Sequence, residues 1–207
     1  VLICDSNLFD DRVPAIVTML RGMVSEEVVI RAADRDLHSG LYGGMARNPL
    51  HVLSQILATL HDGNGRVQLP GFYDGVHDTP PHLSAQWQSL NFSHQSFLGE
   101  VGLRLPAGET AYSPLEHIWA RPTCEINGVC GGYTGEGFKT VLPSQASAKI
   151  SCRLVEGQDP KKIRTALREH VCSHLPADCN VEFTSFGASP AVVMPSAAPQ
   201  FEIARAA

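Results

Sequence analysis

Two helices with matching start signals constrain the fold of this 207-residue chain more than any other feature. In each, a capping side chain stands directly before a proline, which suits the first helical position. Aliphatic residues then recur three or four positions apart, as they do on the buried face of an amphipathic helix. The first helix has Asn48-Pro49 with Leu50, Leu53, Leu57 and Leu60, and the second has Asp159-Pro160 with Ile163, Leu167, Val171 and Leu175.

Segments rich in β-forming residues surround these helices. Alternation and composition predict strands over residues 13–19, 26–33, 117–129, 146–155 and 181–185. We expect a turn at Arg21-Gly22, and the run Val28-Val29-Ile30 indicates burial of the second strand on both faces. From that strand onward the order is strand, helix, strand, strand, helix, strand. This order predicts an α+β fold of the split βαβ (ferredoxin-like) type, with an antiparallel sheet and both helices on one face.

Residues 65–114 interrupt this pattern. They are rich in proline, glycine, aspartate and serine, yet they contain large apolar residues such as Trp87, Phe92 and Phe97. Linkers lack such anchors, so we expect an ordered, partly helical insertion. Residues 187–199, which are rich in alanine, proline and serine, are expected to form a loop that leaves the domain.

Composition argues against several classes of protein. The net charge of −5 gives no reason to expect nucleic acid or an anionic membrane as a partner. No apolar run is long enough to span a bilayer. None of the six cysteines falls in a CxxC pair, which argues against a structural zinc site and favours reduced thiols in a cytoplasmic protein. The first residues resemble an interior strand without an initiator methionine, so we expect a segment excised from a larger protein.

His38 is the first candidate for chemistry. It lies in the connection between the second strand and the first helix, in the sequence Asp34-Arg35-Asp36-Leu37-His38-Ser39-Gly40. An imidazole placed there could donate to a developing oxyanion or to a substrate carboxylate. The simpler interpretation is a loop histidine that bonds its own backbone, and these residues alone leave both open.

The glycine-rich stretch from Gly132 to Thr140 resembles a phosphate-binding loop at first sight. Its spacing fails because Phe138 stands between the second glycine and Lys139-Thr140. Its context fails too, because Val141-Leu142-Pro143 cannot easily begin a helix that would face a phosphate. We therefore interpret the stretch as a flexible loop that delivers Lys139 or Thr140 to a site.

Two further charged residues could serve a site. Arg153 lies on the polar side of its strand, where it could pair with a substrate carboxylate or simply face solvent. Asp5 ends an apolar strand and could supply one metal ligand, although one carboxylate does not make a site. The remaining histidines follow no ligand spacing and are interpreted as surface or capping residues; they include His51, His61, His77 and His170.

Several segments together resemble one family. DRDLHSGLYGG at residues 34–44 resembles the signature of carnosinase-type dipeptidases. These belong to the co-catalytic zinc peptidases, with aminoacylase, acetylornithine deacetylase and succinyl-diaminopimelate desuccinylase. GEGFKTVLP at 135–143 and SCRLVEGQDP at 151–160 match two more segments in the same order. So do residues 14–22, which end in Leu-Arg-Gly, and Leu69-Pro70-Gly71.

The resemblance implies roles for individual residues. In this family a lid domain with the split βαβ fold interrupts a zinc domain, and the lid pairs with its copy in a second subunit. His38 would then reach the partner's active site and stabilise the oxyanion, and Thr140 would contact substrate from the lid. Arg153 would hold the substrate's terminal carboxylate, with Asn127 as a weaker substrate contact. Asp5 would be the one retained zinc ligand.

The resemblance also implies a domain division. Residues 1–22 would be the edge of a missing catalytic domain and an entry strand, 23–187 the lid with its insertion at 65–114, and 188–207 the exit segment. The remaining ligands of two zinc ions would lie outside the chain. We therefore expect an inactive part of a homodimeric hydrolase of peptide or acyl-amino-acid substrates. The alternative is a stand-alone ferredoxin-like module for protein association or ligand binding.

Overall fold

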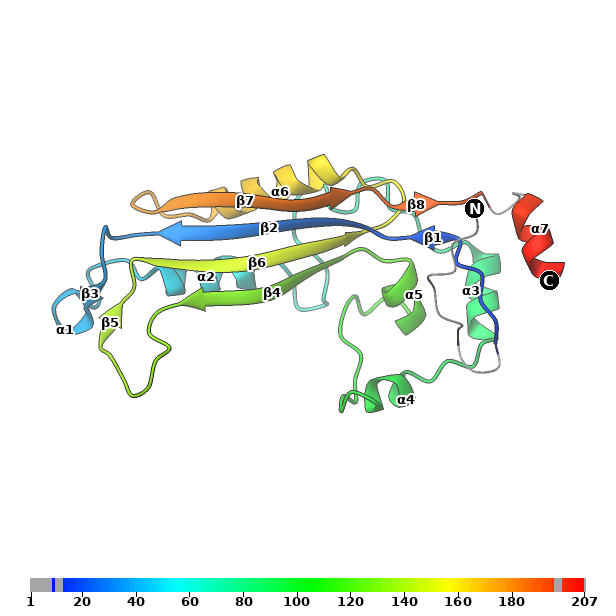
Figure 1. Ribbon diagram of the computed structural model, residues 1–207, viewed down its shortest axis with the longest axis horizontal. Helices are drawn as coiled ribbons and strands as arrows, with labels where there is room; N and C mark the ends of the chain where they lie inside the picture. Colours follow the sequence, from blue (N-terminus) through cyan, green and yellow to red (C-terminus); the bar gives the residue numbers. More distant parts are fainter. Residues whose placement is uncertain (1–8, 10–12, 196–198, 207) are drawn as a thin grey trace.

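A long four-stranded sheet dominates the computed structural model, which describes residue 9 and residues 13–195 and 199–206 (Figure 1). Its strands are all antiparallel and lie in the order β4-β6-β2-β7. They are β2 (Gly22–Arg31), β4 (Thr123–Gly131), β6 (Gln145–Leu154) and β7 (Asn180–Ser189). Helices α2 (Pro49–Ala58) and α6 (Pro160–Ser173) pack against the sheet. The order β2, α2, β4, β6, α6, β7 confirms the predicted α+β arrangement.

One hydrophobic core joins both helices to one face of the sheet. Along β2 every second residue is buried, and Val28 and Ile30 are fully enclosed. Val52 and Leu53 of α2 and Leu167 of α6 lie in the same core cluster. The structure confirms the predicted cap of each helix. The side chain of Asn48 accepts a hydrogen bond from the Leu50 amide, and that of Asp159 accepts one from the Lys161 amide. Within the described ranges, no helix or second sheet covers the other face of the sheet.

Short elements complete each end of the sheet (Figure 1). At one end β3 (Leu37–His38) pairs with β5 (Val141–Leu142), next to α1 (Ser39–Tyr42). At the other end β1 (Met19–Leu20) pairs with β8 (Val192–Val193). The insertion is partly helical, as expected, with α3 (Pro81–Gln88), α4 (His94–Gly99) and the start of α5 (Pro114–Trp119). Helix α7 (Pro199–Ala206) follows near the end of the chain.

The predicted first strand and its turn are wrong. Residues 13–18 form no strand, and Gly22 begins β2 rather than closing a turn. A Cβ at Gly22 would stand 2.4 Å from the carbonyl oxygen of Ser189, so this position needs glycine for the close approach of two backbones. The sequence alone predicts a turn at Gly22, whereas the backbone of Ser189, its neighbour in the tertiary structure, explains why a glycine stands there.

Two other strand limits also differ from the prediction. The expected strand at 117–129 begins at Thr123, because Ser113 and Glu116 form a capping box that starts α5 and includes His117 in that helix. Strand β7 continues to Ser189, and the expected loop at 187–199 contains β8 and the start of α7. Strand β2 is not buried on both faces, because Val29 lies on the uncovered side and is half-buried.

Two buried carboxylates fix separate parts of the fold. Glu26, 1 % exposed, lies on β2 under α6 and pairs with Arg164 at 2.8 Å and with Arg168. Glu109, in the insertion, forms a two-pronged ion pair with Arg121 at 2.7 and 3.0 Å. The first interaction ties α6 to the sheet, and the second ties the insertion to the segment that enters β4.

The prediction that His170 is a surface or capping residue is wrong. It lies on the buried face of α6 and is 7 % exposed. Its Nε2 atom lies 2.8 Å from the hydroxyl oxygen of Thr59, just after α2, so it joins the two helices. Burial, and then the charge of the neighbouring His174, lower the pKa of this imidazole.

This depressed pKa predicts a loss of stability in acid. The unfolded chain has an ordinary histidine pKa near 6.5, so it takes up a proton before the folded state does. The contribution of His170 is therefore complete above about pH 6.5 and is lost as pH falls through the lower folded pKa. The free energy of unfolding in urea, measured between about pH 8 and pH 5, should fall in acid for the wild type and should fall less for His170→Leu. An equal dependence of this free energy on pH in the two proteins would contradict the prediction.

The described residues contain no helix with the length and apolar character needed to cross a membrane. Cys124, Cys130, Cys152, Cys172 and Cys179 carry free thiols, and Cys4 lies outside the described residues.

Candidate functional site

His38 and Thr140 meet at one end of the sheet, in a structure that we call the tip (residues 36–45 and 132–144). The β3–β5 pair places His38 opposite Val141. The Ser39 amide donates to the Thr140 carbonyl at 2.9 Å, and the Ser144 amide donates to the carboxylate of Asp36 at 2.8 Å. Residues about 100 positions apart in the chain are therefore held together by backbone hydrogen bonds.

The ring of His38 is exposed and oriented by its own backbone. Its Nδ1 atom accepts a hydrogen bond from the Gly40 amide at 2.9 Å, which is the simpler role that the sequence allowed. A neutral imidazole that accepts at Nδ1 carries its proton on Nε2. That second nitrogen lies 3.4 Å from the Thr140 hydroxyl. The capping role and a donor role are thus compatible, because each uses a different nitrogen.

Gly40 is part of this arrangement, although no role for it was predicted from the sequence. A Cβ there would lie 2.7 Å from Cε1 of the His38 ring, so a larger residue would displace the imidazole. Lys139 is turned elsewhere, because its ammonium lies over the ring of Tyr133 at 4.6 Å. Of the two residues that the loop could deliver, Thr140 is the one placed beside His38.

The tip also exposes large apolar side chains. Leu41, Met45 and Phe138 are 78, 89 and 87 % exposed, and all three lie on the segments that carry His38 and Thr140. Exposed apolar residues that gather on one surface are typical of sites that contact another molecule.

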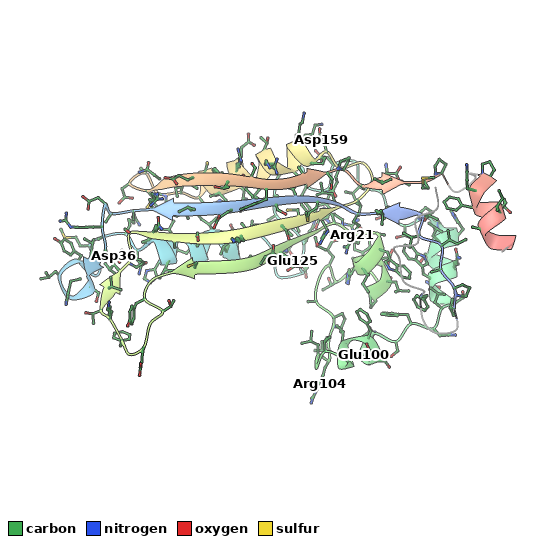
Figure 2. The ribbon with its side chains drawn as sticks, in the orientation of Figure 1. Arg21, Asp36, Glu100, Arg104, Glu125 and Asp159 are labelled. Carbon is green, nitrogen blue, oxygen red and sulfur yellow. The ribbon has the colours of Figure 1, made fainter. Side chains whose placement is uncertain are left out.

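Arg153 lies toward the opposite end of the sheet. It is exposed on β6, opposite Met23 of β2 and Thr123 of β4. Arg21 lies directly before β2, two residues from Met23, and thus at this same end of the sheet. Burial, and then the positive charge of Arg153, lower the pKa of the Arg21 guanidinium. Figure 2 shows Arg21 at this end and Asp36 at the tip.

The distance between these two groups is decisive for what one chain can do. From Gln145, beyond the tip, to Arg153 the strand advances eight residues. At about 3.3 Å per residue this is roughly 26 Å. A fully extended dipeptide spans only about 7 Å. His38 and Arg153 of one chain therefore cannot contact the same dipeptide.

The other candidates are not joined to either group. Asn127 is the exposed, unpaired residue of a bulge in β4, between the residues that pair with Ile150 and Lys149, and thus lies midway along the sheet. Asp5 falls outside the described residues, so its proposed metal role stays a prediction. Within the described ranges, no three histidine, cysteine, aspartate or glutamate side chains gather as a metal site would require. The described residues therefore do not form a site for a zinc ion.

This fold, with a histidine-bearing tip and a distant arginine, agrees with a known class of domain. The sequence profile of the peptidase dimerisation domain, M20 class, matches residues 18–179. The chain belongs to this family.

Similar proteins include two kinds of dipeptidase. The Cys-Gly metallodipeptidase DUG1 of Candida albicans is 30 % identical over 173 residues, which cover 84 % of this chain and 36 % of that protein. The human Beta-Ala-His dipeptidase is 29 % identical over 175 residues, which cover 84 % of this chain and 34 % of that protein. The chain thus spans about a third of the length of these relatives.

Two solved structures have the same fold. An M20 family metallo-carboxypeptidase from Sulfolobus solfataricus, Sso-CP2, is 32 % identical with a TM-score of 0.75, over 86 % of this chain and 46 % of the other. Human carnosine dipeptidase 1 gives a TM-score of 0.82 over 97 % of this chain and 43 % of the other. At 23 % identity the second likeness shows the fold alone.

Proposed function

We propose that this chain is the lid and dimerisation domain of a zinc-dependent dipeptidase, and that it is inactive by itself. The observation that carries the proposal is the separation of His38 and Thr140 from Arg153 along one sheet. Because one chain cannot bring both groups to a dipeptide, a complete site needs groups from two chains. A homodimer supplies them if the tip of one subunit enters the site beside Arg153 of the other. The apolar tip residues Leu41, Met45 and Phe138 support such a contact.

Each residue has a distinct chemical role in this proposal. His38 donates from Nε2–H to the oxyanion that forms when the amide carbonyl is attacked, while Nδ1 stays bonded to Gly40. The Thr140 hydroxyl lies beside that donor and contacts the substrate. Arg153 binds the terminal carboxylate through its planar guanidinium. Asn127 would be a further substrate contact from the middle of the sheet.

The metal belongs mostly to the rest of the parent protein. Zinc in such enzymes polarises a carbonyl and activates water. Asp5 would supply one ligand, and the other ligands would lie outside this chain. The domain limits of 1–22, 23–187 and 188–207 and a cytoplasmic location are part of the same proposal.

The substrate is expected to be a short peptide or acyl-amino acid with a free carboxylate. The names of the two relatives, a Cys-Gly and a Beta-Ala-His dipeptidase, are consistent with this class. The stand-alone association module is not favoured, because the relatives are peptidases whose own chains are much longer.

Hydrolysis assays on two proteins test the proposal. The full-length parent should hydrolyse Cys-Gly, lose this activity after chelation and regain it with zinc. The 207-residue chain should show no hydrolysis with or without zinc, and should sediment as a dimer if the lid suffices for association. Persistent activity of the parent after complete metal removal, or hydrolysis by the isolated chain, would exclude the assignment.

A further inference from the structure

Two arginines lie near one another at the Arg153 end of the sheet, and among the described residues neither pairs with a carboxylate. Arg21 lies directly before β2, whose first residue Gly22 pairs with Leu154, the neighbour of Arg153 on β6. Among the described residues neither forms an ion pair or a side-chain hydrogen bond, and the positive charge of Arg153 acts on Arg21. The other described arginines with a buried or half-buried side chain are different: Arg121 pairs with Glu109, and Arg164 and Arg168 both pair with Glu26.

This arrangement is unfavourable in the absence of an anion. Arg21 is only half-exposed, so its charge is partly desolvated, and a like charge lies beside it. Both effects disfavour the charged form, which is the form that arginine keeps. The chain could relieve the repulsion with a nearby carboxylate, as it does at Glu26 and Glu109. It leaves these two guanidinium groups unpaired instead.

We propose that Arg21 is a second carboxylate-binding residue, which acts together with Arg153 on the terminal carboxylate of the substrate. This inference rests on the proposed function, which assigns only Arg153 to that group. Two guanidinium groups can offer N–H donors to both carboxylate oxygens, and charge-assisted bonds of this kind are stronger than neutral ones. The substrate anion also removes the repulsion between the two arginines when it binds.

Selectivity for a free carboxylate follows from this pair. A terminal carboxamide carries no negative charge, and its NH2 group would face donors rather than acceptors. The two arginines would then remain repelled and partly unpaired. The site should therefore discriminate between a dipeptide and its amide, and each arginine should contribute to the discrimination.

The test compares Cys-Gly with its C-terminal amide in the full-length parent enzyme. Four variants are measured: Arg21→Gln, Arg21→Lys, Arg153→Gln and the control Arg104→Gln. Arg104 is an exposed arginine in the insertion, with no ion pair among the described residues and no part in the proposed site (Figure 2). KM, kcat and the thermal midpoint are recorded for each variant.

The expected result is selective for the carboxylate. Arg21→Gln should raise KM for Cys-Gly by roughly tenfold to hundredfold, as loss of a charged hydrogen bond does. Its effect on the amide should stay within about twofold, because that interaction is absent there. Arg21→Lys should restore only part of the affinity, since an ammonium keeps the charge but not the planar donors. The thermal midpoint of Arg21→Gln should equal or exceed that of the wild type, because a repelled charge is removed.

The outcomes separate this inference from the proposed function. If Arg153→Gln raises KM for Cys-Gly selectively and Arg21→Gln behaves like Arg104→Gln, the role of Arg21 is excluded and the function stands. A lower thermal midpoint for Arg21→Gln, with equal losses on dipeptide and amide, would show a structural pairing instead and overturn the inference. If neither arginine affects Cys-Gly selectively, the carboxylate site itself is wrong.

Discussion

His38→Ala in the full-length parent is expected to lower kcat for dipeptide hydrolysis by about a hundredfold to a thousandfold. Nδ1 accepts from Gly40, so Nε2–H is the donor that the substitution removes. The side chain is exposed and its capping bond from Gly40 belongs to a single helical turn, so the free energy of unfolding should fall by no more than about 1 kcal/mol. Steady-state kinetics and urea unfolding of the same preparation measure both quantities.

A mixed dimer tests whether His38 acts in the partner's site. His38→Ala and Arg153→Ala are each nearly inactive as homodimers, because every site lacks one group. In a mixed dimer one site combines the intact Arg153 of one subunit with the intact His38 of the other. Equal co-expression should therefore restore roughly a quarter of the wild-type activity, since half of the dimers are mixed and each has one complete site.

The control is a mixture of His38→Ala with His38→Gln, which contains no intact His38 and should stay inactive. If His38 and Arg153 served the same subunit's site, the mixed dimer would contain no complete site at all. If dimers shown to be mixed recover no activity, the two-subunit site is wrong. A wild-type rate for His38→Ala would exclude the role of the imidazole.

Glu109→Ala should be among the most destabilising substitutions in the chain, at about 3–5 kcal/mol. Glu109 and Arg121 are 7 and 4 % exposed, and both prongs of their ion pair are well formed. Removing the carboxylate leaves the Arg121 guanidinium buried against Tyr112 without a counter-charge. Urea unfolding of the 207-residue chain measures the loss.

A double substitution distinguishes an unpaired charge from lost packing. Glu109→Leu with Arg121→Met removes both charges and should cost much less than Glu109→Ala alone. As a matched exposed pair, Arg31 and Glu182 lie 2.9 Å apart, and Glu182→Ala should change stability by no more than about 1 kcal/mol. An equal loss for Glu109→Ala and the double variant would show that charge burial is not the cause.

Local signals predicted the parts of the fold that depend on neighbours in sequence. The caps at Asn48 and Asp159 and the alternation along β6 are such signals, and the structure confirms all three. The wrong predictions share a different cause. Gly22 looked like a turn residue because the reason for it, the backbone of Ser189, lies far away in the chain. His170 looked like a surface residue because its partner Thr59 belongs to the other helix.

The candidate site shows the same division. His38, Thr140, Arg153 and Asn127 were chosen from the sequence, yet it gave no distances between them. The sequence predicts Arg21 as part of a turn, and only its neighbour in the tertiary structure, Arg153, gives it another meaning. Arg21 belongs to the Leu-Arg-Gly segment that resembles the family, but this resemblance does not predict that the charge of Arg153 lies beside it.

By itself the sequence determined the two capped helices and most of the strands of the sheet, and which residue types are available for oxyanion and carboxylate binding. These depend on side-chain periodicity and on capping hydrogen bonds, which act over a few residues. Only the tertiary structure decided that the imidazole and the guanidinium lie at opposite ends of one sheet. Strand pairing between residues more than 100 positions apart sets that distance, and pairing at long range is not encoded in any local pattern.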